Sequence, residues 1–161
     1  MHVDDIDWSQ WHPTVRCTLL FVLRDGQVLL IRKKRGLGAG KINGPGGKLD
    51  PGETPLECAF RETQEELGIQ PTQVEEAGKL YFDFVDGLRI ECTVFKAEDC
   101  VGAPTETEEA IPLWTSVDAV PYDEMWADDR YWLPALLAGR TFSLWATFDD
   151  DALLDHRLSV G

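Results

Sequence analysis

The segment Gly47–Ile69, GKLDPGETPLECAFRETQEELGI, constrains the fold of this chain most, because it marks both ends of one helix. Thr54 and Glu57 have the residue types and the spacing of a capping box, and Pro55 occupies the first helical position, which proline favours. Gly68 is the residue type that most often ends a helix. We therefore expect a helix that begins at Pro55 and ends before Gly68, behind a glycine-rich turn.

The two sides of this predicted helix differ in polarity. An apolar stripe at helical spacing is expected to pack inward, and it consists of Leu56, Ala59, Phe60, Thr63 and Leu67. Glu62, Glu65 and Glu66 share the opposite side, because successive residues are about 100° apart around the axis. Glu53 lies just upstream. Like charges at these spacings destabilise an exposed helix slightly. A bound divalent cation would turn this repulsion between the carboxylates into a net stabilisation.

The acidic side of the helix has two interpretations from charge alone. Oxygen ligands favour a hard cation such as Mg²⁺, which keeps several waters and bridges to substrate phosphates. A solvated acidic face is the alternative, since the whole chain is acidic. Six of the fifteen basic residues, however, lie within residues 32–48, directly before the acidic helix. This juxtaposition favours a small polyphosphate bound together with a metal ion.

The spacing of the glycine, glutamate and arginine residues in this segment resembles the pattern of a known family. The pattern G-x5-E-x7-R-E-x-x-E-E-x-G-I is filled by Gly47, Glu53, Arg61, Glu62, Glu65, Glu66, Gly68 and Ile69. This pattern resembles the Nudix box, with one departure at Thr63, where the family usually has an aliphatic residue. The resemblance implies the Nudix fold and a metal-dependent hydrolase that cleaves a diphosphate linkage.

The rest of the chain alternates strand-like and helix-like segments. Two hairpins are predicted around Asp25-Gly26 and Asp86-Gly87. A strand and turn are expected over 112–121, a helix over 122–139 interrupted at Pro134, and two strands separated by an acidic turn over 141–160. Strands on both sides of a long helix favour an α/β (α+β) class, an α/β/α sandwich around a mixed sheet. We expect a single domain over 1–161, with 1–12 as an N-terminal extension.

Length and charge narrow the possible functions. A chain of 161 residues with 43% apolar residues suits one substantial core. The net charge of −14 argues against binding to polymeric nucleic acid. No apolar run is long enough to span a membrane, and the first residues lack the pattern of a signal peptide. We therefore expect a cytoplasmic monomer that acts on a small molecule, with no membrane partner.

The cysteines and histidines do not form a recognisable site. Cys17, Cys58, Cys92 and Cys100 are widely separated and include no C-x-x-C pair. The three histidines lie far from one another and from the acidic helix. Neither a zinc centre nor a cysteine–histidine dyad is supported, and buried free thiols are expected.

A narrower resemblance covers nearly the whole chain. The segments KKRGLGAGKINGPGGK, KLYFDFV, ETEEAIPLW, MWADDRYWLP and LLDHRLSV resemble, in the same order, MutT-like enzymes of the vertebrate type that hydrolyse oxidised purine nucleoside triphosphates. The resemblance implies conversion of a nucleotide such as 8-oxo-dGTP to the monophosphate and pyrophosphate, and hence sanitation of the nucleotide pool. It also implies Mg²⁺ as the cofactor, with Mn²⁺ as a possible substitute.

The same resemblance assigns the catalytic and metal-binding residues. The implied metal ligands are the carbonyl of Gly46 and the carboxylates of Glu62, Glu65, Glu66 and Glu109. Glu53 and Arg61 complete the catalytic set, with Arg61 anchoring Glu53 and the loop. Without the resemblance, Glu109 is one acid among several in a predicted loop and would be interpreted as solvated.

A third group of residues is implied to bind the substrate. Trp126 would stack on the purine, while Asp128 and Asp129 hydrogen-bond its Watson–Crick edge. The chemistry of two adjacent carboxyls agrees with this role. In a poorly solvated pocket the pKa of at least one of them is raised, so that this one can donate a hydrogen bond while the other accepts one. The other implied contacts are Thr18, Lys33, Asn43, Pro45, Gly46, Gly47 and Lys48.

Alternatives remain for these substrate residues and for the substrate. An aromatic cluster usually packs in a core, and Asn43 beside a glycine is typical of a turn. Leu37 and Pro45 stand where close relatives have aromatic residues, and the loop at 86–90 is one residue shorter. Another Nudix substrate, such as a dinucleoside polyphosphate or an ADP-sugar, is the first alternative. A non-catalytic nucleotide-binding regulator is the second.

Overall fold

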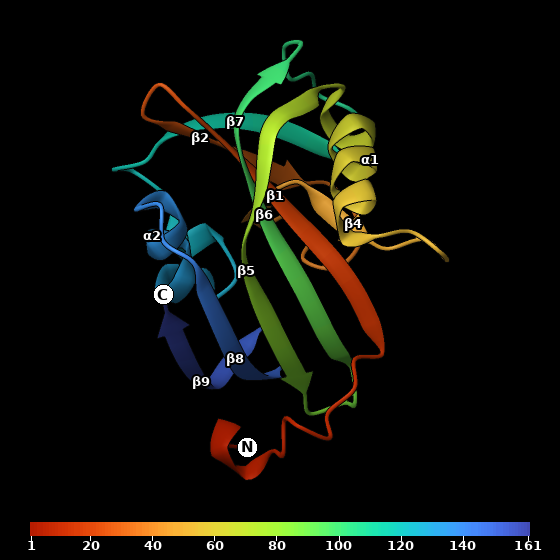
Figure 1. The fold of residues 1–161 in the computed structure, drawn as a ribbon, viewed down its shortest axis with the longest axis vertical. Coiled ribbons are helices and arrows are strands. Elements are labelled where there is room, and N and C mark those ends of the chain that lie inside the picture. The colour runs from red at the N-terminus through yellow and green to blue at the C-terminus, as the bar shows by residue number, and fades with distance from the viewer.

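The computed structural model describes all residues from Met1 to Gly161, and its centre is one large mixed β-sheet (Figure 1). The elements in chain order are η1 (Val3–Asp5), β1 (Val15–Arg24), β2 (Gln27–Lys33), β3 (Ile42–Asn43), β4 (Gly46–Lys48), α1 (Pro55–Leu67), β5 (Gln70–Phe84), β6 (Arg89–Val101), β7 (Ala110–Ser116), η2 (Tyr122–Glu124), α2 (Asp129–Leu137), β8 (Phe142–Asp149) and β9 (Ala152–Val160).

The strand order is β3-β2-β1-β6-β5-β8-β9, with β4 paired to β1 and β7 paired to β2. The pairs β1–β6 and β5–β8 are parallel, and the others are antiparallel. Leu20 packs in a core cluster with residues of α1, whereas its neighbour Phe21 packs with residues of α2. Because neighbouring strand residues face opposite sides of a sheet, α1 and α2 cover opposite faces. The predicted α/β class with a mixed sheet is confirmed.

Helix α1 has the predicted limits and the predicted caps. The Thr54 Oγ1 accepts a hydrogen bond from the Glu57 N–H at 3.2 Å, and Glu57 Oε1 accepts one from the Thr54 N–H at 3.0 Å. Gly68 ends the helix with φ 70°. The local chemistry of this segment was therefore sufficient to predict it.

The predicted faces of α1 were wrong at two positions. Leu56 is 44% exposed, and Glu66, expected on the solvent side, is only 5% exposed. The buried stripe is rotated toward Glu66 because β4 packs against α1 in addition to β1. Thr63 does face the core, and its Oγ1 donates to the carbonyl oxygen of Ala59 at 2.7 Å.

The other predicted elements are present, with two corrections. The helix predicted over 122–139 begins only at Asp129, and Tyr122–Glu124 forms the separate 3₁₀ helix η2. Both hairpins form, β1–β2 across Asp25-Gly26 and β5–β6 across Asp86-Gly87. Helix α2, however, continues through Pro134, where a break was predicted. The proline is tolerated because the carbonyl that loses its partner belongs to Arg130, an exposed residue in the first turn of α2.

The first twelve residues lie against the sheet (Figure 1). Val3 is buried, and its N–H donates to Asp155 Oδ2 at 2.8 Å. The Trp11 Nε1–H donates to Asp83 Oδ2 at 3.0 Å, and its ring meets Tyr81 edge-on with centroids 6.0 Å apart. The segment expected as an extension thus covers part of β5, β8 and β9.

No helix of the structure combines the length and the apolar character that a membrane span requires.

All four cysteines are free thiols. Cys58 and Cys92 are buried, as the sequence predicted. Cys17 and Cys100 are only half-buried, so the prediction was wrong for these two. Both stand on strands, where the alternation of faces and the distance from the covering helices, rather than residue type, set the exposure.

Candidate active site

A cavity of about 680 Å³ brings together residues from both halves of the chain. Of the predicted site residues, the following line it: Thr18, Lys33, Asn43, Gly46, Gly47, Lys48, Glu62, Glu66, Glu109, Trp126, Asp128 and Asp129. Glu53, Arg61 and Glu65 stand outside the lining, although Arg61 contacts Glu62. Pro45 is buried away from the cavity, and its carbonyl accepts the Leu20 N–H at 2.9 Å. The structure therefore places Pro45 between β3 and β4, beside β1 and outside the cavity lining.

Part of the cavity lining was not predicted from the sequence. Apolar side chains from three strands, Leu80, Phe82, Phe84, Ile90 and Phe148, form much of its wall. The alternation in KLYFDFV placed the first three of these on one face. Periodicity cannot tell a face that fills a core from one that borders a cavity, because both are apolar.

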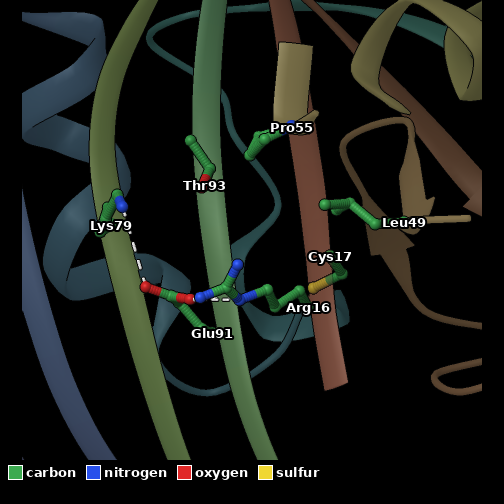
Figure 2. A pocket seen from close by; sticks show the side chains of 7 residues that line it. All are labelled: Arg16, Cys17, Leu49, Pro55, Lys79, Glu91 and Thr93. Carbon is green, nitrogen blue, oxygen red and sulfur yellow. Dashed lines mark ion pairs between the residues drawn. The ribbon is translucent and has the colours of Figure 1, made fainter. Parts of the chain in front are cut away.

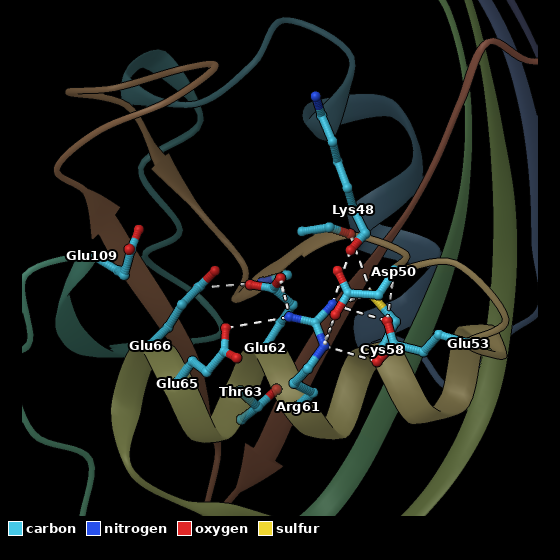
Figure 3. Close-up of polar contacts among 12 residues, drawn as sticks. Lys48, Asp50, Glu53, Cys58, Arg61, Glu62, Thr63, Glu65, Glu66 and Glu109 are labelled. Carbon is cyan, nitrogen blue, oxygen red and sulfur yellow. Dashed lines mark hydrogen bonds and ion pairs between the residues drawn. The ribbon is translucent and has the colours of Figure 1, made fainter.

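Two box glutamates face each other at the inner side of α1 (Figure 3). The pKa of Glu66 is raised to about 8, first because the carboxyl is buried and second because the charge of Glu62 is close. The Gly46 N–H is 3.4 Å from Glu66 Oε2, a long hydrogen bond. Figure 3 also shows Glu109 on the side of Glu66, carried by the segment before β7. The burial of Glu66 is therefore locally unfavourable in the metal-free protein.

The glycine-rich turn touches this glutamate pair directly. A Cβ on Gly47 would lie 2.5 to 2.7 Å from the carboxylate atoms of Glu62. A Cβ on Gly46 would lie 1.9 Å from the carbonyl oxygen of Thr18. Glycine is required at position 46, because the atom in the way belongs to the backbone of β1, whereas a side chain at position 47 would displace the carboxylate of Glu62.

Arg61 holds the outer side of the cluster. Its Nε and Nη2 donate to the two carboxylate oxygens of Glu53 at 2.8 and 2.9 Å, a bidentate pair. Its Nη1 donates to Glu62 Oε1 at 2.8 Å, and Nη2 also donates to the carbonyl of Lys48 at 3.0 Å. The guanidinium lowers the pKa of Glu53 to about 2. Arg61 thus ties the loop and Glu62 together, the arrangement expected of an anchoring residue.

The donor set fits a hard divalent cation. Glu66 makes no ion pair, and among the nearby charges the Glu62 carboxylate affects its pKa more than the Lys33 ammonium does. Oxygen donors in this arrangement suit Mg²⁺. Three carboxylates do not already converge on one point, because Glu109 is paired with Arg35 through its Oε1. Glu109 is half-exposed, so it can change partner at small cost.

Trp126 is fixed on two sides beside the apolar wall. Its ring meets Phe148 edge-on, with centroids 5.9 Å apart. A Cβ on Gly38 would lie 2.7 Å from Trp126 Nε1, so the glycine-rich loop packs directly on the indole. The Lys41 ammonium lies 5.4 Å from the ring centroid. Trp126 is thus a rigid aromatic surface in the cavity wall, whereas Trp132 is fully buried in the core, stacked on Phe142.

Two adjacent carboxyls lie beside Trp126 with unequal partners. Asp128 and Asp129 are 2% and 3% exposed. Asp128 Oδ2 accepts the Trp132 Nε1–H at 2.8 Å, whereas Asp129 Oδ2 has no hydrogen-bond partner although it is buried. Burial raises the pKa of Asp128 to about 6, and burial next to Asp128 raises the pKa of Asp129 well above its ordinary value. Both raised pKa values mean that the pair retains a proton more readily than two separate carboxyls do, and a pair with one proton offers both a donor and an acceptor to the cavity.

The fold and this site define the class of protein. The NUDIX domain model matches residues 12–136, most of the chain, and the chain therefore belongs to the Nudix family. Members of this family generally need a divalent cation such as Mg²⁺. The family predicted from the box is confirmed.

Individual relatives extend the similarity over the whole domain. The chain is 38% identical over 143 residues to the oxidized purine nucleoside triphosphate hydrolase of Danio rerio, and 41% identical over 143 residues to the protein of the same name from Mus musculus. Each match covers 88% of this chain and 92% of the relative. Among solved structures, the mutator MutT protein from Bacillus halodurans is similar with a TM-score of 0.81 and 30% identity, over 90% of this chain and 97% of that one.

Proposed function

We propose that this protein is a Mg²⁺-dependent diphosphohydrolase that converts an oxidised purine nucleoside triphosphate, such as 8-oxo-dGTP, to the monophosphate and pyrophosphate. The observation that carries the proposal is the unpartnered Asp129 carboxyl beside the buried carboxyl of Asp128, in the same cavity as the Glu62–Glu66 pair. One cavity thus offers groups for a purine edge and groups for a metal-bound triphosphate. The similarity to the fish and mouse hydrolases supports the assignment.

The proposed reaction uses water as the nucleophile. Glu62, Glu65, Glu66, Glu109 and the Gly46 carbonyl would hold the divalent cation. A cation held by these residues would supply charge stabilisation to the phosphates and would lower the pKa of the attacking water. One box glutamate accepts the proton of that water.

The remaining residues of the chain position this machinery. Arg61 fixes the carboxylates of Glu53 and Glu62 through its hydrogen bonds. Lys33 and Lys48 both line the cavity. Lys33 is close enough to Glu66 to offset part of the rise in the pKa of that carboxyl. Their ammonium groups are therefore proposed to neutralise the triphosphate, with Gly47 leaving room for it beside Glu62.

Base recognition is proposed to use the unequal carboxyls. Protonated Asp129 donates to an acceptor on the purine, and ionised Asp128 accepts from an adjacent N–H. Trp126 stacks on the base, which contributes roughly 1–3 kcal/mol with little selectivity among bases. Thr18 and Asn43 line the same cavity and are proposed as further contacts. Selectivity therefore depends on the hydrogen bonds, because a polar edge that lacks its partner is costly.

A substrate panel tests the function. Pyrophosphate release is measured for 8-oxo-dGTP, 2-oxo-dATP, dGTP and ATP, and product formation for diadenosine polyphosphates and ADP-ribose. The proposal expects the highest kcat/KM with an oxidised purine triphosphate, and only with a divalent cation. A higher kcat/KM for a dinucleotide or ADP-ribose would contradict it, and tight binding without turnover would indicate a regulator.

That the protein is a cytoplasmic monomer remains a prediction from the sequence.

The metal-free protein is expected to gain stability when Glu66 is replaced by glutamine. Burial and the nearby charge of Glu62 disfavour an ionised carboxyl here. With a pKa of about 8 the buried carboxyl is mostly protonated at neutral pH, and glutamine removes the cost of taking up that proton, which should raise the free energy of unfolding by about 1–3 kcal/mol in chelator. Urea denaturation measures this difference. The same variant should lose most of the increase in Tm that Mg²⁺ gives the wild type, because a ligand is lost.

The exposed residue Glu76 on β5 provides the matched control. Glu76→Gln removes the same charge from the surface, so neither the stability in chelator nor the Mg²⁺-induced increase in Tm should change. A Glu66→Gln variant that is less stable than wild type in chelator would show that the burial of Glu66 is not unfavourable.

Affinity for the product nucleotide is expected to fall as the solution is acidified. Below about pH 6 Asp128 takes up a proton, because its pKa is raised to about 6, and the cavity loses its acceptor. Binding of 8-oxo-dGMP in chelator, followed by intrinsic tryptophan fluorescence, isolates this effect from the metal site. The dissociation constant should rise between about pH 7 and about pH 5. A flat profile across this range would contradict the assigned acceptor.

A further inference from the structure

Two of the four free thiols stand side by side in the wall of the large cavity. Cys17 on β1 and Cys92 on β6 are direct register partners of the parallel pair β1–β6. Register partners in a parallel pair point to the same face of the sheet, and both cysteines line the cavity. Adjacent strands are about 4.7–4.9 Å apart. This spacing lies within the Cα separation of about 4.4–6.8 Å that a disulfide requires.

Ion pairs next to these thiols hold β1 and β6 in register. The paired side chains lie on the face of the sheet opposite to the two thiols. The Arg16 Nε lies 3.1 Å from Glu91 Oε2, which ties β1 to β6 one residue before the cysteine pair (Figure 2). Lys79 on β5 lies 3.7 Å from the other oxygen of Glu91. These contacts border a small cavity of about 70 Å³, which Cys17 also lines. The separation of the two thiols is thus fixed by the sheet rather than by loops.

The two thiols differ in access. Cys17 is half-buried, so a small oxidant can reach it through the cavity. Cys92 is buried and has its pKa raised well above the ordinary value, first because its thiol faces that of Cys17 and second because of its burial. Cys17 is therefore the thiol that reacts first with the oxidant, and Cys92 is the thiol that then attacks the oxidised Cys17 sulfur.

We propose that Cys17 and Cys92 form a reversible disulfide site, oxidised by a hydroperoxide such as H₂O₂, which changes the wall of the nucleotide cavity. The geometry supports the pairing of these two rather than of any other thiols. Cys58 stands on α1, on the other face of the sheet, where its thiol accepts a hydrogen bond from Thr18 at 3.3 Å. Cys100 lies at the far end of β6, paired in register with Pro71.

The chemistry balances in two steps. The Cys17 sulfur attacks one oxygen of H₂O₂, the O–O bond breaks, and sulfenic acid and water are formed. The Cys92 sulfur then attacks the Cys17 sulfur, the S–O bond breaks, and the departing hydroxide takes up the Cys92 proton as a second water. Two thiols lose two electrons and the peroxide gains them. Proximity offsets the small thiolate fraction of Cys92, since the reaction is intramolecular.

The bond should change substrate binding because of its neighbours. Thr18 follows Cys17 and lines the cavity, and Lys48 is the register partner of Cys17 on β4. Drawing the two sulfurs together shifts β1 relative to β6 at this point. The effect on turnover rests on the proposed function, whereas formation of the bond does not.

Peptide mapping tests the bond directly. The full chain, freed of reductant, is treated with H₂O₂ in chelator, alkylated and digested, and the peptides are weighed. The expected product is a peptide joining Cys17 to Cys92, lighter by two hydrogens and cleaved by dithiothreitol. Cys92→Ser should give no linkage and should leave a Cys17 sulfenic acid that dimedone traps. Cys100→Ser is the matched control and should form the linkage as wild type does.

Kinetics then test the consequence. Each variant is compared with its own reduced form, so changes in basal activity do not enter. Oxidised wild type and Cys100→Ser should show a severalfold higher KM that dithiothreitol restores, and Cys17→Ser should not respond. Loss of thiols without this linkage, a linkage to Cys58 or Cys100, or an unchanged KM in fully linked protein overturns the proposal. If no nucleotide is hydrolysed in any form, the proposed function fails, while the mapping still decides on the bond.

Discussion

Replacing Glu62 by glutamine is expected to reduce kcat by roughly 100-fold or more and to leave the fold intact. Glutamine has the shape of glutamate, so it fits against Gly47 and still accepts the hydrogen bond from Arg61 Nη1. It lacks the charge that holds a divalent cation beside Glu66. Pyrophosphate release at saturating substrate, with a titration of Mg²⁺, measures the effect.

The control for this loss is Glu76→Gln, which removes an equal charge from an exposed position on β5. Its kcat should equal that of the wild type, and the circular dichroism spectra of both variants should match the wild-type spectrum. Near-normal turnover of Glu62→Gln at saturating Mg²⁺ would show that the metal ligands have been assigned to the wrong residues.

Asp128→Asn is expected to reduce kcat/KM for the oxidised purine by roughly 10- to 100-fold, because a hydrogen bond to a charged group is worth about 1.5–3 kcal/mol. The amide oxygen can still accept the Trp132 Nε1–H, so the buried contact survives. The acceptor offered to the base, however, loses its charge, and Asp129 loses the neighbour that keeps it protonated. Most of the change should appear in KM, since the carboxyl is proposed to contact the base and not the phosphates.

Asp123→Asn is the matched control, because Asp123 lies nearby on an exposed turn and pairs only with Arg130. Its KM should be unchanged. If Asp128→Asn instead reduced kcat with no change in KM, the carboxyl would act on the chemical step, and the proposed recognition of the base would be wrong.

The local features of the fold were predictable because their causes lie close together in sequence. The Thr54–Glu57 capping box and Gly68 fixed α1, and the Asp-Gly pairs fixed both hairpins. The two wrong predictions for α1 also share one cause. The burial of Glu66 and the exposure of Leu56 depend on β4 packing beside α1, which is a long-range contact. Propensity and periodicity contain no information about such a contact.

The candidate site shows the same division. The box residues could be named because their spacing is a pattern, and Trp126, Asp128 and Asp129 because their segment resembles a family. No pattern in the chain, however, separates Phe82 or Phe148 from ordinary core residues. The structure is also what removes Pro45 from the cavity and leaves Asp129 without a partner.

The sequence by itself determined the acidic helix, the glycine turn before it and the family of the protein, since these depend on residues a few positions apart. Only the tertiary structure decided which carboxyls are buried, which are paired, and that Cys17 meets Cys92 across two parallel strands. The physical reason is that burial and strand register are set by contacts between distant segments. The ionisation and reactivity of a side chain follow from those surroundings more than from its own type.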